Sequence, residues 1–440
     1  MVFGKGDVVT KATTFGLSTP ERVYPQMPHE PASVAGTSDA ATDSRNPTTD
    51  RIDGEGASPS APSEPPNETT VTYSVSSGFV ARLALLNISV AISSYQSGKF
   101  YLLGRNPRGG LMVDERLFQK AMGICVENTS LVLATLFQIQ HFENVLKQGE
   151  FINHTYDACY VPRRTYTTGV LDAHDIGLLR SGEIIFVNTR FNCLAMLSQT
   201  RSFRPVWTPR FVSVVVDEDR CHLNGMAMED GQPRYVTAVS RSNTIDGWRD
   251  RRSNGGVVID VETNEIVCDG LSMPHSPRLY QGRLWILNSG AGEIGWVDLE
   301  SRTFKALAFC PGFLRGLAFA GRYAFVGLSK PRYERFEGLS LDGKLKAFDS
   351  EPWCGIQVID LETGTCVDWF RIDGAVTEIY DVATVPNVAC PMSLGFASTE
   401  IQSLVAHDEI PMGEPVWSAP DTAQCAGLIA RASSNSLPGG

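Results

Sequence analysis

The sequence predicts an all-β fold, a six-bladed β-propeller, and three observations carry this prediction. Short apolar strands separated by turn residues recur along the chain, and no long segment has the period of a helix. The strands group in fours, as in HSPRLYQG, RLWILNSG, EIGWVDLE and TFKALAFC. The first strands of successive groups begin near Met122, His174, His222, His275 and Arg315, so the spacings are 52, 48, 53 and 40 residues. Such a period is typical of propeller blades.

Two segments at the ends of this region complete the ring. SVAISSYQ, KFYLLGR and GLMVDERLF provide three strands without an inner partner, and EIYDVATVP provides an inner strand with nothing after it. We expect the last strand, at about 378–385, to join the first three as one blade, because closing the ring removes exposed strand edges. Six blades result. Seven is the alternative, if residues 143–173 or 329–353 contain further strands.

Both ends of the chain differ in composition from the region between them. Residues 1–71 are rich in Ser, Thr, Pro, Gly and Asp and contain few large apolar side chains. Such a segment cannot offset its ordering entropy by burial, so we expect a disordered N-terminal tail. Residues 401–440 have a similar composition and are expected to be largely disordered. The propeller domain is then 72–400.

Charge and cysteine content limit the partners and the compartment. The chain has 440 residues and a formal net charge of −11, which opposes nucleic acids and anionic membrane surfaces. No apolar run has the length of a membrane span, and the N-terminus has no apolar signal region. None of the ten cysteines forms a C-x-x-C pair, and most lie in apolar runs, which favours buried free thiols. We therefore expect a soluble, cytoplasmic protein with neither nucleic-acid nor membrane partners.

The starts of the inner strands should meet on one face of the propeller. The loop between the second and third strands of a blade reaches the same face, and the long insertions 240–256 and 329–353 fall in this loop. Long loops on one side of a rigid scaffold commonly carry binding sites. The polar residues at the inner-strand starts are His174, Asp175, His222, Asn224, His275, Arg315, Glu378 and Asp381.

Three of the seven histidines, His174, His222 and His275, occupy this position in successive blades. Three neutral imidazoles around a channel mouth with an open side form a typical ligand set for a catalytic transition metal. We expect one divalent ion, Zn, Fe, Cu or Mn. Glu378 and Asp175 are the candidate catalytic residues, as bases or as partners that orient the ligands. A polar channel without metal and a metal-free catalytic histidine are the alternatives.

Arg315 in FLRG and Arg278 in PHSPR are the candidate cations of the channel. A guanidinium fork suits a carboxylate, phosphate or sulfate on a ligand. The alternative is a salt bridge to Glu378 or Asp381 across the channel. Three further residues near the expected face complete the candidate substrate-binding set, namely Asn224, Arg190 and Arg241.

Several motifs resemble those of a known family. DRCHLNG, MPHSPR and FLRGLAF, within matching segments from about residue 90 to residue 388, are similar to an uncharacterised, mainly bacterial family of conserved hypothetical proteins. The resemblance implies a propeller-like protein and implies no activity. The family's motif I-H-E-M reads Ala173-His174-Asp175-Ile176 here, which keeps the histidine and an acid.

These observations favour a metal-dependent enzyme that acts on a small anionic substrate at the channel mouth. The alternative is a binding module whose loop face holds a small molecule or a peptide without catalysis. A third reading is a six-bladed lactonase with calcium in the channel, bound by Glu378, Asn224 and Asp381. Calcium prefers oxygen ligands, however, and three imidazoles do not suit it.

Overall fold

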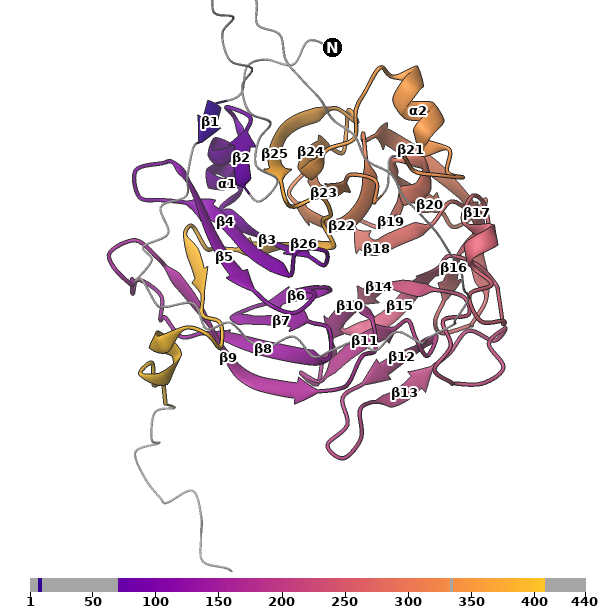
Figure 1. Ribbon diagram of the computed structural model, residues 1–440, viewed down its shortest axis with the longest axis horizontal. Helices are drawn as coiled ribbons and strands as arrows, with labels where there is room; N and C mark the ends of the chain where they lie inside the picture. The colour runs from indigo at the N-terminus through magenta and orange to yellow at the C-terminus, as the bar shows by residue number, and fades with distance from the viewer. Residues whose placement is uncertain (1–6, 10–69, 333–334, 408–440) are drawn as a thin grey trace, which may run out of the picture. The chain divides into compact units, whose positions relative to one another are not determined.

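Six β-sheets surround a central axis in the unit Met1–Gly395 (Figure 1). The computed structural model describes residues 7–9, 70–332 and 335–407. Each sheet is one blade, and its innermost strand contacts the innermost strands of both neighbouring blades. The six-bladed propeller is therefore confirmed.

The first three blades, from the inner strand outwards, begin with the one that closes the ring. It contains β26 (Asp381–Pro386), β3 (Ile88–Ser94), β4 (Lys99–Arg105) and β5 (Leu111–Leu117). The second contains β6 (Ile124–Glu127), β7 (Ser130–Ala134), β8 (Gln138–Asn144) and β9 (Ala158–Thr167), with β27 (Pro391–Ser393) parallel to β9. The third contains β10 (Ala173–Leu178), β11 (Ile184–Asn188), β12 (Cys193–Met196) and β13 (Arg204–Trp207).

The other three blades complete the ring. The fourth contains β14 (Leu223–Glu229), β15 (Gln232–Ala238), β16 (Gly256–Asp260) and β17 (Ile266–Leu271). The fifth contains β18 (Pro274–Tyr280), β19 (Arg283–Asn288), β20 (Glu293–Asp298) and β21 (Thr303–Phe309). The sixth contains β22 (Phe313–Ala320), β23 (Tyr323–Ser329), β24 (Cys354–Asp360) and β25 (Cys366–Gly374), extended by β2 (Val71–Val75) and β1 (Asp7–Val9).

The ring closes as predicted, with the last inner strand joining the first three strands. β26 pairs antiparallel with β3, from Asp381 opposite Ser93 to Pro386 opposite Ile88. The two segments considered for a seventh blade have other roles. Residues 143–173 supply β9 and the start of β10, and the described part of 329–353 supplies the helix α2 (Leu341–Ala347). Six sheets therefore account for the blades of the described chain.

Some short elements were not predicted. The helix α1 (Phe79–Leu86) contacts β3, β4 and β25, and β2 adds a fifth strand to the sixth blade where Val71 lies opposite Gly374. Three 3-10 turns are η1 (Arg249–Arg251), η2 (Ser289–Ala291) and η3 (Thr399–Gln402), the last in the separate unit Phe396–Gly440. Residues 1–6, 10–69 and 408–440, which make up most of the expected disordered tails, lie outside the described residues.

Apolar second strands explain how the blades pack. The segments IIFVN in β11, AFVGL in β23 and LWIL in β19 are almost entirely buried, because each blade is covered by a neighbour on both faces. Phe186 and Phe325 are among the fully buried side chains. The nine cysteines within the described residues are all free, and most of them are buried in these layers. No helix in the described part of the chain is long and apolar enough to cross a membrane.

Candidate functional site

A β-bulge interrupts four successive inner strands at the same place. The register shifts between Ala173 and Ile176 in β10, between Leu223 and Gly225 in β14, between His275 and Arg278 in β18, and between Leu314 and Leu317 in β22. A bulge places an extra residue in one strand and turns its side chain to a new direction. His174, Asn224, His275 and Arg315 all lie in or beside these bulges. The candidate residues are therefore placed by one structural device, repeated blade by blade.

A cavity of about 560 Å³ lies at this end of the channel, a volume typical of small-molecule sites. The inner-strand starts line it with His174, His222, Arg315, Glu378 and Tyr380. The insertion 240–256 adds Trp248, Arg249 and Arg252, and the described part of 329–353 adds Lys330, Arg332, Arg335 and Phe336. As expected, both insertions reach the face on which the inner strands begin.

The ring of His174 is held through one nitrogen. Its Nδ1 lies 3.0 Å from the carbonyl oxygen of Asp172 and 2.7 Å from Oγ1 of Thr189. The Thr189 hydroxyl donates to the carbonyl of Leu223 at 2.6 Å, so its oxygen accepts from the histidine. Both neighbours are acceptors, so Nδ1 carries the proton and Nε2 keeps its lone pair.

The other two histidines are held through the same nitrogen. Nδ1 of His222 lies 2.6 Å from Oδ2 of Asp219, and Nδ1 of His275 lies 2.9 Å from the carbonyl oxygen of Met273. Asp219 also accepts the backbone N–H of His222, whose φ of 53° is left-handed. In all three imidazoles an oxygen therefore orients Nδ1, as it does in histidines that bind a metal through Nε2.

The imidazoles share a buried environment. The rings of His174 and His222 lie edge to face with centroids 4.9 Å apart, and His174 and His275 both line a small void at the base of the cavity. Burial lowers the pKa of both His174 and His275, and the Arg315 guanidinium lowers it further, so both are neutral near pH 7. Within residues 7–9, 70–332 and 335–407, no group of three or more His, Cys, Asp or Glu side chains is arranged to hold a metal ion. The three-histidine metal site stays a prediction.

Arg315 is a buried cation without a carboxylate partner in the described chain. Its Nε makes no hydrogen bond, and no ion pair to this guanidinium forms among the described residues. Two aromatic rings flank it instead, with the guanidinium carbon 5.4 Å from the centroid of Phe313 and 5.2 Å from that of Tyr380. Burial lowers the pKa of Arg315. The salt bridge considered for this residue is not formed, because Glu378 pairs with Arg332 at 2.9 Å.

Arg278 has the opposite environment and forms the salt bridges that were the alternative to ligand binding. Its Nη1 lies 2.7 Å from Oδ2 of Asp175, and its Nη2 lies 3.7 Å from Oδ1 of Asp381. Oδ2 of Asp175 also accepts the backbone N–H of Met226, and Oδ2 of Asp381 accepts that of Ile124. Each carboxylate thus joins its own inner strand to that of the next blade.

The Asp381→Asn variant is expected to lose a pH dependence of stability. Burial raises the pKa of Asp381 from 3.8 to about 7, and Asp175 adds to the rise while Arg278 opposes it. The folded protein then holds this proton more tightly than the unfolded chain. The resulting stability is complete below pH 3.8 and is lost as the pH rises through about 7. Urea unfolding at several pH values should show a steeper decline for the wild type than for the variant. Equal slopes would contradict this assignment.

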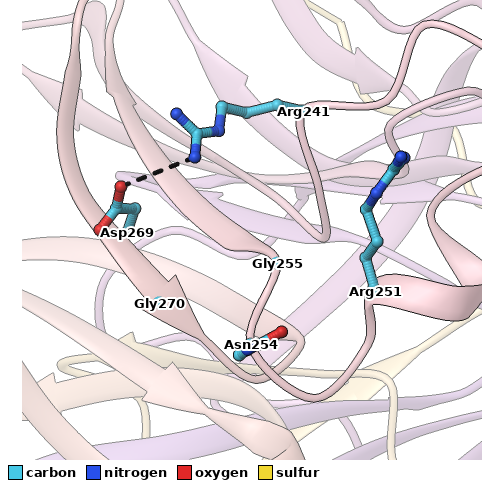
Figure 2. Close-up of a pocket in the computed structure, with 6 residues that line it drawn as sticks. All are labelled: Arg241, Arg251, Asn254, Gly255, Asp269 and Gly270. Atoms are coloured by element: carbon cyan, nitrogen blue, oxygen red, sulfur yellow. Dashed lines mark ion pairs between the residues drawn. The ribbon is translucent and has the colours of Figure 1, made fainter.

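The remaining predicted binding residues are only partly brought to the cavity. Asn224 lines the small inner void, with its Nδ2 3.3 Å from Nε2 of His275. Arg190 is half-buried and pairs with Asp217 at 2.6 Å. Arg241 lines a different pocket, shown in Figure 2, where its guanidinium points toward Asp269 at 3.9 Å. Neither Arg190 nor Arg241 is among the residues that line the central cavity.

Aromatic side chains of the cavity were missed by the sequence-based reasoning. Tyr95, Trp248, Phe313 and Tyr380 line it, and Arg332 holds Glu378 there. A signal existed for Trp248, which lies in the insertion 240–256 that we expected on this face. Tyr380 directly precedes the closing strand β26, next to the acidic residues that drew attention to that segment.

Comparisons with known proteins follow this geometry. Residues 77–394 match a family model described as a domain of unknown function, DUF4915. No curated protein sequence matches the chain. A nidogen/laminin complex matches at 11% identity and a TM-score of 0.44, covering 68% of this chain and 99% of that chain. A streptogramin B lyase structure matches at 14% and 0.33, covering 53% and 70%. Virginiamycin B lyase from Staphylococcus aureus matches at 11% and 0.33, covering 65% and 95%. The fold described above rests on the sheets of this chain and not on these matches.

Proposed function

The chain belongs to the DUF4915 family of domains of unknown function, and we propose that its central cavity binds a small organic anion through Arg315. The observation that carries this proposal is the buried guanidinium of Arg315, which meets no carboxylate in the part of the chain that the structure describes. Burying an unpaired charge is costly, and the two aromatic rings compensate for only a part of that cost. An anionic ligand would supply the missing partner, with a planar fork of donors already in place.

The charge around the cavity supports the same ligand class. Among the described residues, its lining contains six cationic and four acidic side chains, although the whole chain has a net charge of −11. The cations are Arg249, Arg252, Arg315, Lys330, Arg332 and Arg335, and the acids are Asp172, Asp219, Glu337 and Glu378. Two of the acids already pair with lining arginines, Glu378 with Arg332 and Glu337 with Arg335. An excess of positive charge in a recessed site raises the local concentration of anionic ligands.

Calorimetric titration of the full chain with acetate and with inorganic phosphate tests the proposal. We expect saturable binding of at least one of the two anions. The Arg315→Lys variant should bind it about tenfold more weakly, because lysine keeps the charge and loses the bidentate fork. Arg241→Lys is the matched control, since Arg241 lines another pocket, and it should bind like the wild type. Equal affinity in the Arg315→Lys variant would refute an anion site at Arg315.

A second candidate is a metal-dependent enzyme at the same cavity. The observation that favours it is the shared orientation of His174, His222 and His275, in which an oxygen acceptor faces every Nδ1. This arrangement makes Nε2 the nitrogen for a divalent transition ion such as Zn, Fe, Cu or Mn, and in His275 the ion would replace the contact of Nε2 with Nδ2 of Asn224. An ion bound there would act as a Lewis acid beside the anion held by Arg315, with Glu378 and Asp175 as the candidate acidic groups.

Titration of untagged, chelator-treated protein with Co²⁺ is expected to give one bound ion per chain. Co²⁺ held by protein ligands in a four- or five-coordinate site absorbs much more strongly in the visible region than the hydrated ion, so its binding is read directly. Loss of this absorption in His275→Phe, with retention in His154→Phe, would support the predicted site. His154 lies in a turn of the loop between β8 and β9 and does not line the cavity, so it serves as the control. Absence of any cobalt spectrum in the wild type would remove this candidate and leave the anion site untouched.

A further inference from the structure

We propose that the anion bound by this cavity carries a flat, unsaturated ring, which makes the ligand an aromatic carboxylate. This inference rests on the proposed anion site and specifies what lies next to the charged group. It comes from the aromatic lining of the cavity, which the charge argument does not use.

Three pairs of stacked rings line the same cavity. They are Tyr95 with Tyr380 at a centroid distance of 5.6 Å and an angle of 27°, His222 with Trp248 at 4.2 Å and 30°, and Phe313 with Phe336 at 6.4 Å and 24°. The pairs come from different parts of the chain, so one local sequence feature does not explain them. Aromatic rings recognise one another by offset stacking and by edge-to-face contact, and they present flat surfaces that fit a flat ligand.

The cation and the rings form one continuous surface. Phe313 and Tyr380 each belong to a stacked pair and also flank the Arg315 guanidinium. An anion seated on Arg315 therefore lies next to two of the three stacked pairs. A carboxylate conjugated to an aromatic ring is coplanar with it, so the guanidinium fork and the ring walls can be engaged by one rigid group.

Three buried hydrogen-bond donors without a partner in the described chain also belong to residues that line the cavity. The Tyr380 hydroxyl and the Trp248 indole N–H are buried and make no hydrogen bond among the described residues, as is the case for Nε of Arg315. The side chains of Arg315, Tyr380 and Trp248 are exposed by only 9%, 6% and 7%. All three line this one cavity. Three of the nine buried side-chain polar atoms without a hydrogen bond among the described residues belong to the wall of this cavity, and acceptors on a ligand would be partners for them.

Calorimetry with two ligands of the same skeleton tests the inference. The probes are 2-naphthoate and its fully saturated counterpart, decahydronaphthalene-2-carboxylate, with acetate and inorganic phosphate as ring-free anions. We expect 2-naphthoate to bind about tenfold or more tightly than the saturated acid, because only the flat ring gains the aromatic contacts. Phe313→Leu and Trp248→Leu should each reduce this preference. Phe348→Leu is the matched control, because Phe348 stacks on Phe309 and does not line the cavity.

Each outcome separates the inference from the proposed function. If the saturated acid, acetate or phosphate binds as tightly as 2-naphthoate, and Arg315→Lys weakens that binding, the ring inference is overturned and the anion site stands. If no probe binds, or Arg315→Lys has no effect on any of them, the anion site fails and the inference fails with it. Thermal melts of each variant identify a folding defect. If one aromatic variant does not fold, the other variant and the wild-type comparison still decide the question.

Discussion

The Arg315→Met variant is expected to be more stable than the wild type and unable to bind small anions. Methionine has a similar length, fills the same space and carries no charge. The wild-type guanidinium is buried between Phe313 and Tyr380 without an ion pair in the described chain, so its removal eliminates a desolvation cost and breaks no salt bridge. Replacing buried charge by apolar side chains of similar volume stabilises some proteins by about 1–4 kcal/mol. We expect a gain of about 1–2 kcal/mol here.

The loss of binding should be the larger effect. Removing one partner of a buried, hydrogen-bonded charge pair costs about 2–5 kcal/mol, which corresponds to a weakening of about 30-fold or more. Urea unfolding and ligand titration on the same preparation measure both quantities. A variant that is more stable and binds more weakly than the wild type identifies a residue retained for function, because functional sites commonly hold groups that destabilise the fold.

Arg241→Met provides the comparison for this variant. Arg241 is exposed and loosely paired with Asp269 at 3.9 Å, so neither stability nor affinity should change by more than about 0.5 kcal/mol. A clear loss of stability in Arg315→Met would show that the guanidinium has a structural role, and the case for a ligand would lose its main support.

The repeat pattern was sufficient to predict the architecture. Turn glycines and apolar strands marked each blade, and the unpaired segment before Pro386 identified the closing strand β26. These features follow from local chemistry, because a strand must bury its faces and a ring must pair its edges. The elements that were missed, α1 and β2, are short and add to the outside of the ring, where no repeat pattern predicts them.

The candidate site was predicted only in outline, for a physical reason. The distance in sequence from the histidine to the first turn glycine differs between blades, from His174 to Gly182 and from His275 to Gly282. Both inner strands contain a bulge, and the turns that follow them differ in length, because Leu178 lies opposite Ile184 whereas Tyr280 lies opposite Arg283. A bulge changes which face a side chain takes, and strand alternation alone does not reveal it. The ion-pair partners of each arginine could not be predicted from the sequence either. Arg278 and Arg315 look alike as residues on neighbouring inner strands, yet of these two only Arg278 meets carboxylates within the described residues.

That contrast predicts the opposite outcome for Arg278→Met, which should be strongly destabilised. The substitution leaves Asp175 and Asp381 buried without their cation and removes hydrogen bonds to the carbonyls of Met226 and Pro277. Breaking a buried ion pair by removing one partner costs about 3–5 kcal/mol, and we expect a loss in this range near pH 8. Each of the two carboxylates links neighbouring inner strands, so destabilising them weakens the contacts between the blades.

The loss of stability in Arg278→Met should also depend on pH, and the titration of Asp381 determines the direction of this dependence. Without the guanidinium, the pKa of Asp381 rises further above its unfolded value, so the variant regains stability as Asp381 takes up its proton and loses it as the pH increases. The difference between wild type and Arg278→Met, measured by urea unfolding, should therefore be larger at about pH 8 than at about pH 5. Arg322→Met is the matched control, because the Arg322 side chain is exposed and pairs with the buried Asp360 and the exposed Glu362. Water screens an exposed guanidinium, so its removal should cost less than that of Arg278. If Arg278→Met were no less stable than Arg322→Met at either pH, the buried cluster would not hold the blades together. The contrast between a paired and an unpaired arginine, on which the ligand site depends, would then have no energetic basis.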